Sequence, residues 1–435
     1  MIENWKKRTL WLLISLTIYF SGFSIYTRNF IRFGTEIPPL IFPLQQIRAS
    51  GRILSVAFIL IIIIFSYVFI RVNKKDLINI NYQVNYWRDL LVISLIIIHL
   101  LVIFKLFQGF TTYEIEFFSA VISELFFLLV VMTIALGPSK IITTKDDFRL
   151  AVQSISISVA LFVFSNFAQL LVNEPALYYA GNNIFLGTTG NPQHAASLLV
   201  MSLPSVLYSY QQKTNKLLIK LVWFLTIILT IYFCYETGSR TGFIALCFSL
   251  LLYFSSRVKF IHWLLFFGSL AFIIPEWYNI QGAISDAPVN KLTTFNIDSR
   301  EGNWGRAWRE FNDYFLFGVP LADRPIYIES SWLALYSTLG SVGFLISLLW
   351  LIYFYKQVVF LSQIIKSGKE ITQEANLVRV IFVNSFILSL GEANLLGIIS
   401  PFILILLLNI ALLKFIINYD QNSITTNKAR TLSYS

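Results

Sequence analysis

The stretch Arg88–Phe107, RDLLVISLIIIHLLVIFKLF, is a nearly continuous run of apolar side chains. About 20 such residues form a helix long enough to cross the hydrocarbon layer of a bilayer. Comparable runs recur along the 435 residues, which are 56% hydrophobic and only 13% charged. Soluble domains carry about 25% charged residues, and the mean hydropathy here is +0.69. The sequence therefore predicts an all-α, polytopic integral membrane protein.

Twelve membrane-spanning helices are predicted from these runs. They cover residues 10–27, 53–71, 88–107, 116–136, 150–172, 194–210, 218–236, 241–256, 260–275, 332–355, 377–396 and 398–417. The predicted organisation is transmembrane helices 1–9 in residues 1–275, a large extracytoplasmic loop at 276–331, helices 10–12 in 332–418, and a cytoplasmic tail at 419–435.

The orientation follows from the positions of lysine and arginine. Short basic loops such as Arg71–Lys75, Lys213–Lys220 and Arg257–Lys259 fall on one side of the membrane, and such loops usually face the cytoplasm. Both termini are then cytoplasmic and the large loop lies outside. The first outer loop conflicts with this pattern, since it carries four arginines: Arg28, Arg32, Arg48 and Arg52.

Composition argues against several kinds of site. Cys234 and Cys247 both lie in apolar runs, which indicates neither a disulfide framework nor a thiolate metal site. The three histidines are scattered and none is in the large loop, so a histidine-rich metal site is not expected. The net charge of +10 is spread over the loops of a membrane protein, and no nucleic-acid partner is predicted.

The loop 276–331 is the one long polar excursion and the expected place of the chemistry. It holds Lys291, Arg300, Arg306, Arg309, Arg324, Asp298, Glu301, Glu310, Asp313, Asp323 and Glu329. On a helix, Arg306 and Arg309 would share one face, and two guanidinium groups form a forked site for a diphosphate. The alternative is a solvated helix in which Arg306 pairs with Glu310.

Arg240 stands at the predicted start of a helix, after the turn-forming Gly238 and Ser239. A positive charge is unfavourable there, and a docked anion would offset it. The alternative is an ordinary hairpin whose arginine reaches the lipid headgroups.

Three further residues have both a functional and a structural interpretation. Glu329 precedes a span and could accept a proton from an attacking hydroxyl, but Ser330 and Glu329 also suit a helix cap. His194 follows an Asn-Pro helix start and is either a proton carrier or structural. Glu124 lies within a span, where ionisable groups are functional candidates. A polar set on the fifth span offers it partners: Asn166, Gln169 and Asn173.

Taken in order, several motifs resemble the O-antigen polymerase and O-antigen ligase superfamily of bacterial envelopes. The resemblance covers about residues 190–343. Its parts are Gly190–Ala196 (GNPQHAA), Gly238–Phe243 (GSRTGF), Trp308 with Asp313–Val319 (DYFLFGV), Ser331–Leu333 (SWL) and Leu339–Gly343 (LGSVG). Phe315 stands where the family usually has proline, and Pro320 where a second glycine is expected. Glu329 and Ser330 stand where ligases have histidine and asparagine, which favours polymerisation over ligation.

The resemblance implies a glycosyltransferase without metal or cofactor that uses undecaprenyl-diphosphate-linked oligosaccharides at the outer face of the bacterial cytoplasmic membrane. Arg240 and Arg306 with Glu329 would be catalytic, and the substrate would contact Arg309, Arg300, Arg324 and His194. Chain-length regulator and flippase proteins, with membrane lipids, would be partners.

Three other functions stay open. A ligase would transfer the glycan to lipid A core or to protein. A polysaccharide flippase or transporter predicts polar residues at mid-membrane and broken helices in matching halves. A peptidoglycan polymerase would need a decisive loop aspartate, for which Asp298 and Asp313 are the candidates.

Overall fold

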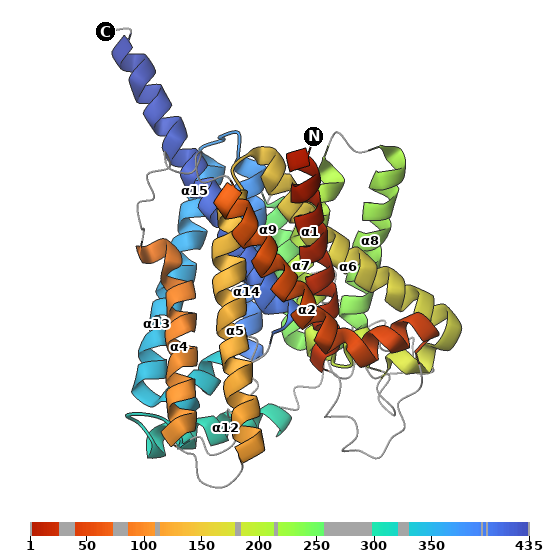
Figure 1. Ribbon diagram of the computed structural model, residues 1–435, viewed down its shortest axis with the longest axis vertical. Helices are drawn as coiled ribbons and strands as arrows, with labels where there is room; N and C mark the ends of the chain where they lie inside the picture. Colours follow the sequence, from red (N-terminus) through yellow and green to blue (C-terminus); the bar gives the residue numbers. More distant parts are fainter. Residues whose placement is uncertain are drawn as a thin grey trace, which may run out of the picture.

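A computed structural model describes residues 2–25, 40–72, 86–108, 114–178, 184–212, 216–255, 298–320, 330–392, 395–396 and 399–433 (Figure 1). Regular structure in these ranges is helical, apart from an isolated bridge between Tyr178 and Phe185. The predicted all-α class is confirmed.

The described helices follow one another in this chain order. They are α1 (Ile2–Ser21), η1 (Gly22–Ile25), α2 (Phe42–Val72), α4 (Tyr86–Gln108), α5 (Glu114–Ile141), α6 (Lys145–Asn173), η3 (Glu174–Leu177), η4 (Gly187–Thr189), α7 (Pro192–Gln211), α8 (Leu217–Glu236), α9 (Arg240–Phe254), α12 (Asp298–Asp313), α13 (Ser331–Lys366), α14 (Thr372–Gly391) and α15 (Pro401–Ser433).

Seven of the described helices are long and apolar enough to cross a membrane: α4, α5, α6, α8, α13, α14 and the first part of α15. They coincide with seven of the predicted spans. The predicted spans at 53–71 and 241–256 match shorter apolar helices, Ile53–Ile64 and Arg240–Phe254. The predicted span 260–275 lies outside the described residues. A count of twelve therefore stays a prediction.

Two helices form the interior of the bundle. On α7, every side chain from Ala195 to Ser209 is buried, and α15 is buried from Phe402 to Phe415. Because α7 is surrounded by α6, α8, α9 and α14, its serines meet protein and not lipid, as when Ser209 and Ser156 share a hydrogen bond of 2.9 Å. This burial explains how a helix with so many polar residues fits inside the bundle.

The two ends of the bundle differ in what they carry. The N- and C-termini lie at the same end, and α12 lies across the opposite end (Figure 1). We call these the terminal end and the α12 end. The chain continues as helix to Ser433, beyond the predicted last span at 398–417, since extending an existing helix adds one hydrogen bond for each residue fixed.

The partner expected for Glu124 is wrong. Glu124 on α5 pairs with His99 Nδ1 on α4, and both side chains are buried. Asn166 and Gln169 instead accept hydrogen bonds from backbone amides of other segments. Asn166 bonds Thr188, and Gln169 accepts from the amide of Ile41. Tertiary packing brings α4 against α5, which sequence periodicity does not reveal.

Candidate functional site

Three helices begin at the α12 end, each with a side-chain cap. Asn191 Oδ1 accepts from the Gln193 amide at the start of α7 (2.8 Å), and Pro192 takes the first helical position. Ser239 Oγ accepts from the Gly242 amide of α9 (3.1 Å). Ser330 Oγ accepts from the Leu333 amide of α13 (3.4 Å). Such caps satisfy amides that have no partner within the helix.

Close packing joins these starts to the end of α14. A Cβ on Gly242 would lie 2.7 Å from that of Ala196, so α9 and α7 touch at this point. Gly391, the last residue of α14, packs directly against the Thr241 side chain of α9. The start of α13 is tied to the same place, since the Ser331 amide and hydroxyl donate to the Glu392 carbonyl at 3.1 and 2.7 Å.

The three helix starts contribute positive potential here, which the C-terminal end of α14 and the buried Glu392 partly offset. Each helix start carries roughly half a positive elementary charge from its aligned peptide dipoles. Arg240, the first residue of α9, adds a full charge and is half-buried. The predicted position of Arg240 at a helix start is confirmed. Anions are the ligands that such an arrangement attracts.

His194 occupies the first turn of α7 and is half-buried. Its Nδ1 atom is shielded from solvent and has no hydrogen-bond partner among the described residues. A buried polar atom without a partner is costly. His194 therefore has hydrogen-bonding capacity that the described fold does not use.

The arginine helix α12 docks on the first turns of α13. Ala307 packs on Ala334, and Ser337 Oγ donates to Glu310 Oε2. Arg306 Nε donates to Glu310 Oε1 at 2.6 Å, which is the i,i+4 pair of the structural alternative, and the Arg306 side chain is 57% exposed. Arg309 is exposed.

The α12 arginines and Arg240 lie at the same end of the bundle, on helices that pack on different neighbours. α12 packs on α13, and α9 packs on α14 and α7, while α13 and α14 pack on each other. The predicted diphosphate site would therefore draw its arginines from two helices, α9 and α12, and it stays a prediction. Arg300 lies in the first turn of α12 without a described side chain, and Arg324 and Glu329 lie outside the described residues.

Sequence reasoning missed Glu392, which directly follows α14. It is 2% exposed and lies where α13 and α14 join. A carboxylate inside the GEAN segment at the end of an apolar run was the available signal. Glu392 is thus a second acidic candidate beside Glu329.

Sequence reasoning also missed Lys105, near the end of α4. Its ammonium group donates to the backbone carbonyls of Phe317 (2.7 Å), Val319 (2.8 Å) and Thr338. The Thr338 carbonyl is free for this contact because α13 is broken at Gly340, whose φ is 56°. Lys105 thereby holds the segment after α12 against α13.

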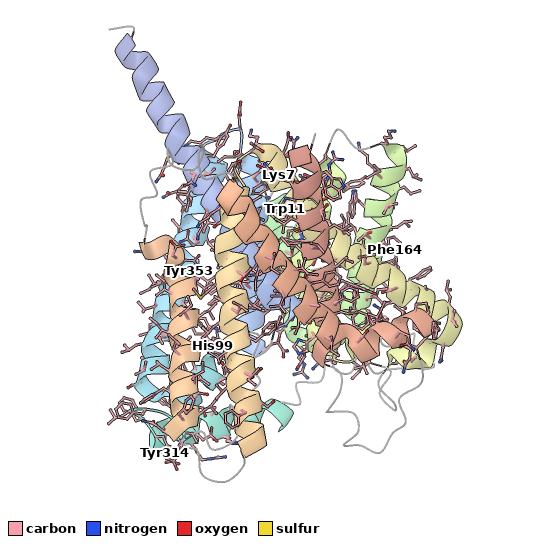
Figure 2. All side chains as sticks on the ribbon, in the orientation of Figure 1. Lys7, Trp11, His99, Phe164, Tyr314 and Tyr353 are labelled. Carbon is pink, nitrogen blue, oxygen red and sulfur yellow. The ribbon has the colours of Figure 1, made fainter. Side chains whose placement is uncertain are left out.

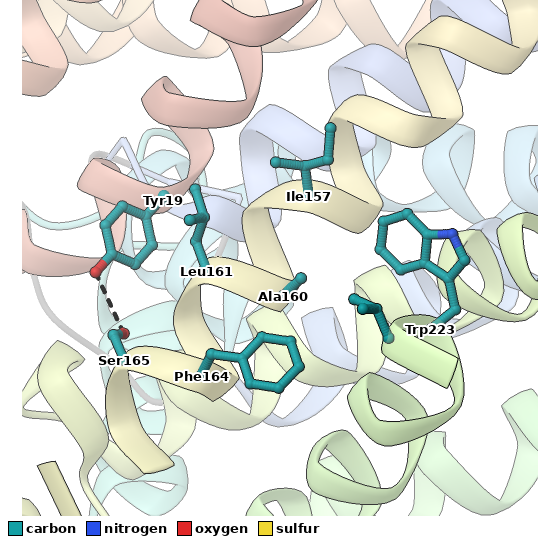
Figure 3. Close-up of a pocket in the computed structure, with 8 residues that line it drawn as sticks. Tyr19, Ile157, Ala160, Leu161, Phe164, Ser165 and Trp223 are labelled. Carbon is teal, nitrogen blue, oxygen red and sulfur yellow. Dashed lines mark hydrogen bonds between the residues drawn. The ribbon is translucent and has the colours of Figure 1, made fainter. Parts of the chain in front are cut away.

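The apolar groove in Figure 3 lies elsewhere. It has a volume of about 520 Å³ and runs between α1, α6 and α8, lined by residues such as Tyr19, Phe164 and Trp223. Its one hydrogen bond among the residues drawn joins Tyr19 to Ser165 (3.2 Å). None of the predicted site residues lines it. Its chemistry suits hydrocarbon chains.

Within the described part of the chain, no three histidine, cysteine or acidic side chains are grouped so that they could hold a metal ion. In comparisons with known proteins, no family model matches the chain and no curated sequence is significantly similar to it.

Proposed function

We propose that this protein is a membrane glycosyltransferase that polymerises polyprenyl-diphosphate-linked oligosaccharides at its α12 end. The observation that carries the proposal is the meeting of three helix starts with Arg240, at the same end of the bundle as the exposed Arg309 of α12. Fixed dipoles and guanidinium groups at one membrane face suit a lipid whose headgroup is a diphosphate.

In the proposed reaction, the bond between the donor sugar C1 and the diphosphate oxygen breaks. A new bond forms from C1 to an acceptor hydroxyl, whose proton passes to a carboxylate. The polyprenyl diphosphate leaves with the bonding electrons. Arg240 and an α12 arginine stabilise its growing charge, a contribution that increases where water is excluded.

Arg309 is the better α12 candidate for contact with the diphosphate. Arg306 already donates to Glu310, which in turn accepts from Ser337. Recruiting Arg306 Nε would break its bond to Glu310 and leave that carboxylate without its cation, whereas Arg309 is exposed. Arg306 then contacts the diphosphate through its remaining N–H groups. Arg300 and Arg324 add further contacts to the lipid-linked donor.

Glu329 is the proposed proton acceptor, and His194 the proposed contact to the acceptor sugar. The free Nδ1 of His194 can accept from or donate to a hydroxyl, according to its tautomer. Glu392 is the alternative base. Comparison of Glu329→Gln with Glu392→Gln assigns the role, because the base variant loses turnover and leaves donor binding intact.

Localisation belongs to the same proposal. We place both termini in the bacterial cytoplasm and the α12 end outside. Accessibility of an introduced cysteine to an impermeant thiol reagent tests this orientation, with the native chain as the blank for Cys234 and Cys247. Arg8→Cys should react only in opened cells, and Asn312→Cys in intact spheroplasts.

The deciding experiment is glycan profiling of a knockout complemented with Arg240→Ala, Arg306→Ala, Arg309→Ala or Glu329→Gln. Loss of long chains with single repeat units still displayed supports a polymerase. Loss of all displayed glycan, with lipid-linked polymer accumulating, indicates a ligase. An unchanged profile for every variant at normal protein level contradicts both enzymes.

A transporter or flippase is the second candidate, favoured by a specific set of observations. α13 is broken at Gly340, residues 184–190 are buried without forming a span, and His99 and Glu124 pair inside the bundle. Broken helices and intramembrane ionisable pairs are typical of transporters. If the protein is a flippase, cells that carry the His99→Phe variant in place of the native protein should retain single lipid-linked repeat units on the cytoplasmic face of the membrane.

A further inference from the structure

The turn after α12 presents four large side chains in succession to the outside. Tyr314 is 46% exposed, Phe315 52%, Leu316 62% and Phe317 74%. Figure 2 shows Tyr314 at the α12 end, at the edge of the molecule. Trp308, on the preceding turn of α12, is 55% exposed. Exposed apolar groups this densely placed indicate an interaction surface.

The backbone of this turn is hydrogen-bonded as a lipid environment requires. The Tyr314 carbonyl accepts from Gly318, the Phe315 carbonyl from the Ser341 amide (2.7 Å), and the Leu316 carbonyl from the Ser341 hydroxyl (2.9 Å). Lys105 serves the carbonyls of Phe317 and Val319. In water these carbonyls would need no protein partner, whereas in a bilayer each must have one.

The surface also continues the apolar sides of two membrane-spanning helices. Lys105 brings the turn to α4, where Phe104 and Phe107 are 59% and 58% exposed. Ser341 brings it to α13, where Leu345 is 60% exposed. The turn therefore extends a surface that the bilayer already covers, and Arg309 lies just before it on α12.

We propose that residues 314–317 insert into the interfacial layer of the bilayer and hold α12 at the depth of the lipid headgroups. Aromatic side chains favour that layer, and arginines on the same amphipathic helix suit anionic headgroups. The occupant is the lipid surface itself. The proposal does not depend on the reaction proposed above.

Spin labels measure the depth directly. Nitroxides are attached at Leu316→Cys and Phe317→Cys in liposomes of phosphatidylethanolamine and phosphatidylglycerol, with Asn312→Cys as the matched control, since Asn312 is exposed on the same helix. The native chain, labelled in parallel, supplies the signal of Cys234 and Cys247 for subtraction. Collision rates with oxygen, which concentrates in lipid, and with a nickel chelate, which stays in water, are compared.

The expected ratio of oxygen to nickel accessibility is several-fold higher at positions 316 and 317 than at 312. Equal ratios at the three positions overturn the proposal, because the turn would then lie in water. Low accessibility to both reagents at 316 and 317 also overturns it, since another protein surface would cover the turn. All variants must elute as the native chain does in size-exclusion chromatography.

Discussion

The terminal end and the α12 end of the bundle both carry many charges but use them differently. At the terminal end, lysines pair with carboxylates: Lys7 with Asp147 (2.9 Å), Lys145 with Glu370 (3.1 Å), and Lys369 with Asp420. Each pair joins segments far apart in the sequence. The charges there connect α1, α6, α15 and the segment between α13 and α14.

At the α12 end, cations serve backbone groups or stay exposed. Lys105 bonds three carbonyls, Arg309 is exposed, and Arg240 begins a helix. Arg306 pairs within its own helix. The difference indicates that these lysines at the terminal end join separate segments of the chain, whereas Lys105 at the α12 end holds backbone carbonyls and the Arg309 side chain is exposed.

The largest expected effect comes from adding a side chain at Gly340, where α13 is broken. In Gly340→Ala, the new Cβ would meet the Phe315 carbonyl and the Gly318 amide at 2.5 and 2.6 Å, with φ at 56°. Backbone atoms cannot move aside as a side-chain end does, so the turn and α12 detach, at a cost of about 3 kcal/mol. The loss of stability is measured by heating the protein in detergent and recording how much of the monodisperse size-exclusion peak remains.

Gly368→Ala is the matched control, because Gly368 also has a positive φ (64°) but nothing lies within 4 Å of its Cβ position. Gly368→Ala therefore measures the cost of the positive φ alone, without the steric overlap that a Cβ at Gly340 makes with the backbone. Equal losses in the two variants would show that the contact between turn and α13 contributes little.

A smaller effect, on activity, is expected from the half-buried Arg240 and the exposed Arg309. Arg240→Ala and Arg309→Ala should each lower polymer synthesis about 100-fold at unchanged protein level, as loss of one preorganised donor does. The double variant should lose less than the product of the two factors, because both groups contact one diphosphate. In vitro turnover of a lipid-linked repeat unit gives the rates.

Arg8→Ala is the control at the terminal end, where Arg8 is also exposed. It should leave turnover unchanged. Fully multiplicative losses in the double variant would indicate two separate sites and contradict a shared diphosphate.

Part of this architecture follows from local sequence. Asn191, Ser239 and Ser330 cap helices because each oxygen bonds an amide two or three residues away, and the pairing of Arg306 with Glu310 needs one helical turn. Seven spans follow from apolar length. These features need no knowledge of tertiary contacts, so they could be predicted.

The other part depends on helices that meet only after folding. Lys105 bonds carbonyls more than two hundred positions away, with a sequence separation of 212 from Phe317. His99 and Glu124 face each other only because α4 packs on α5. No local pattern identifies these partners. The same holds for the positions of Arg240 on α9 and of the arginines on α12, which depend on how α12 packs on α13 and α9 on α14.

Lys105 offers a milder way to weaken the α12 end. Lys105→Met keeps the apolar stem but leaves the carbonyls of Phe317, Val319 and Thr338 without a donor. An unsatisfied buried acceptor costs about 1–3 kcal/mol, and we expect about 2 kcal/mol in total because the site is partly open. Lys140→Met, at an exposed lysine of α5, should cost almost nothing. A loss for Lys105→Met no larger than that of Lys140→Met would contradict the role assigned to Lys105.

The smallest effect is expected at the terminal end. Hydrogen bonds from Lys145 (3.1 Å) and Tyr419 (3.0 Å) hold the pKa of Glu370 below its ordinary value. A depressed carboxyl pKa adds stability that is complete above the ordinary pKa and is lost as pH falls through the folded value. The native chain should therefore be slightly more heat-resistant than Glu370→Gln near neutral pH, with the difference vanishing in acid. Because the pair is exposed, added salt should shrink the difference as well. If the difference in heat resistance persisted in acid, its cause would be the packing of the Glu370 side chain and not its charge. That result would weaken the contrast between the two ends, because the charge of Lys145 would then contribute nothing to stability through Glu370.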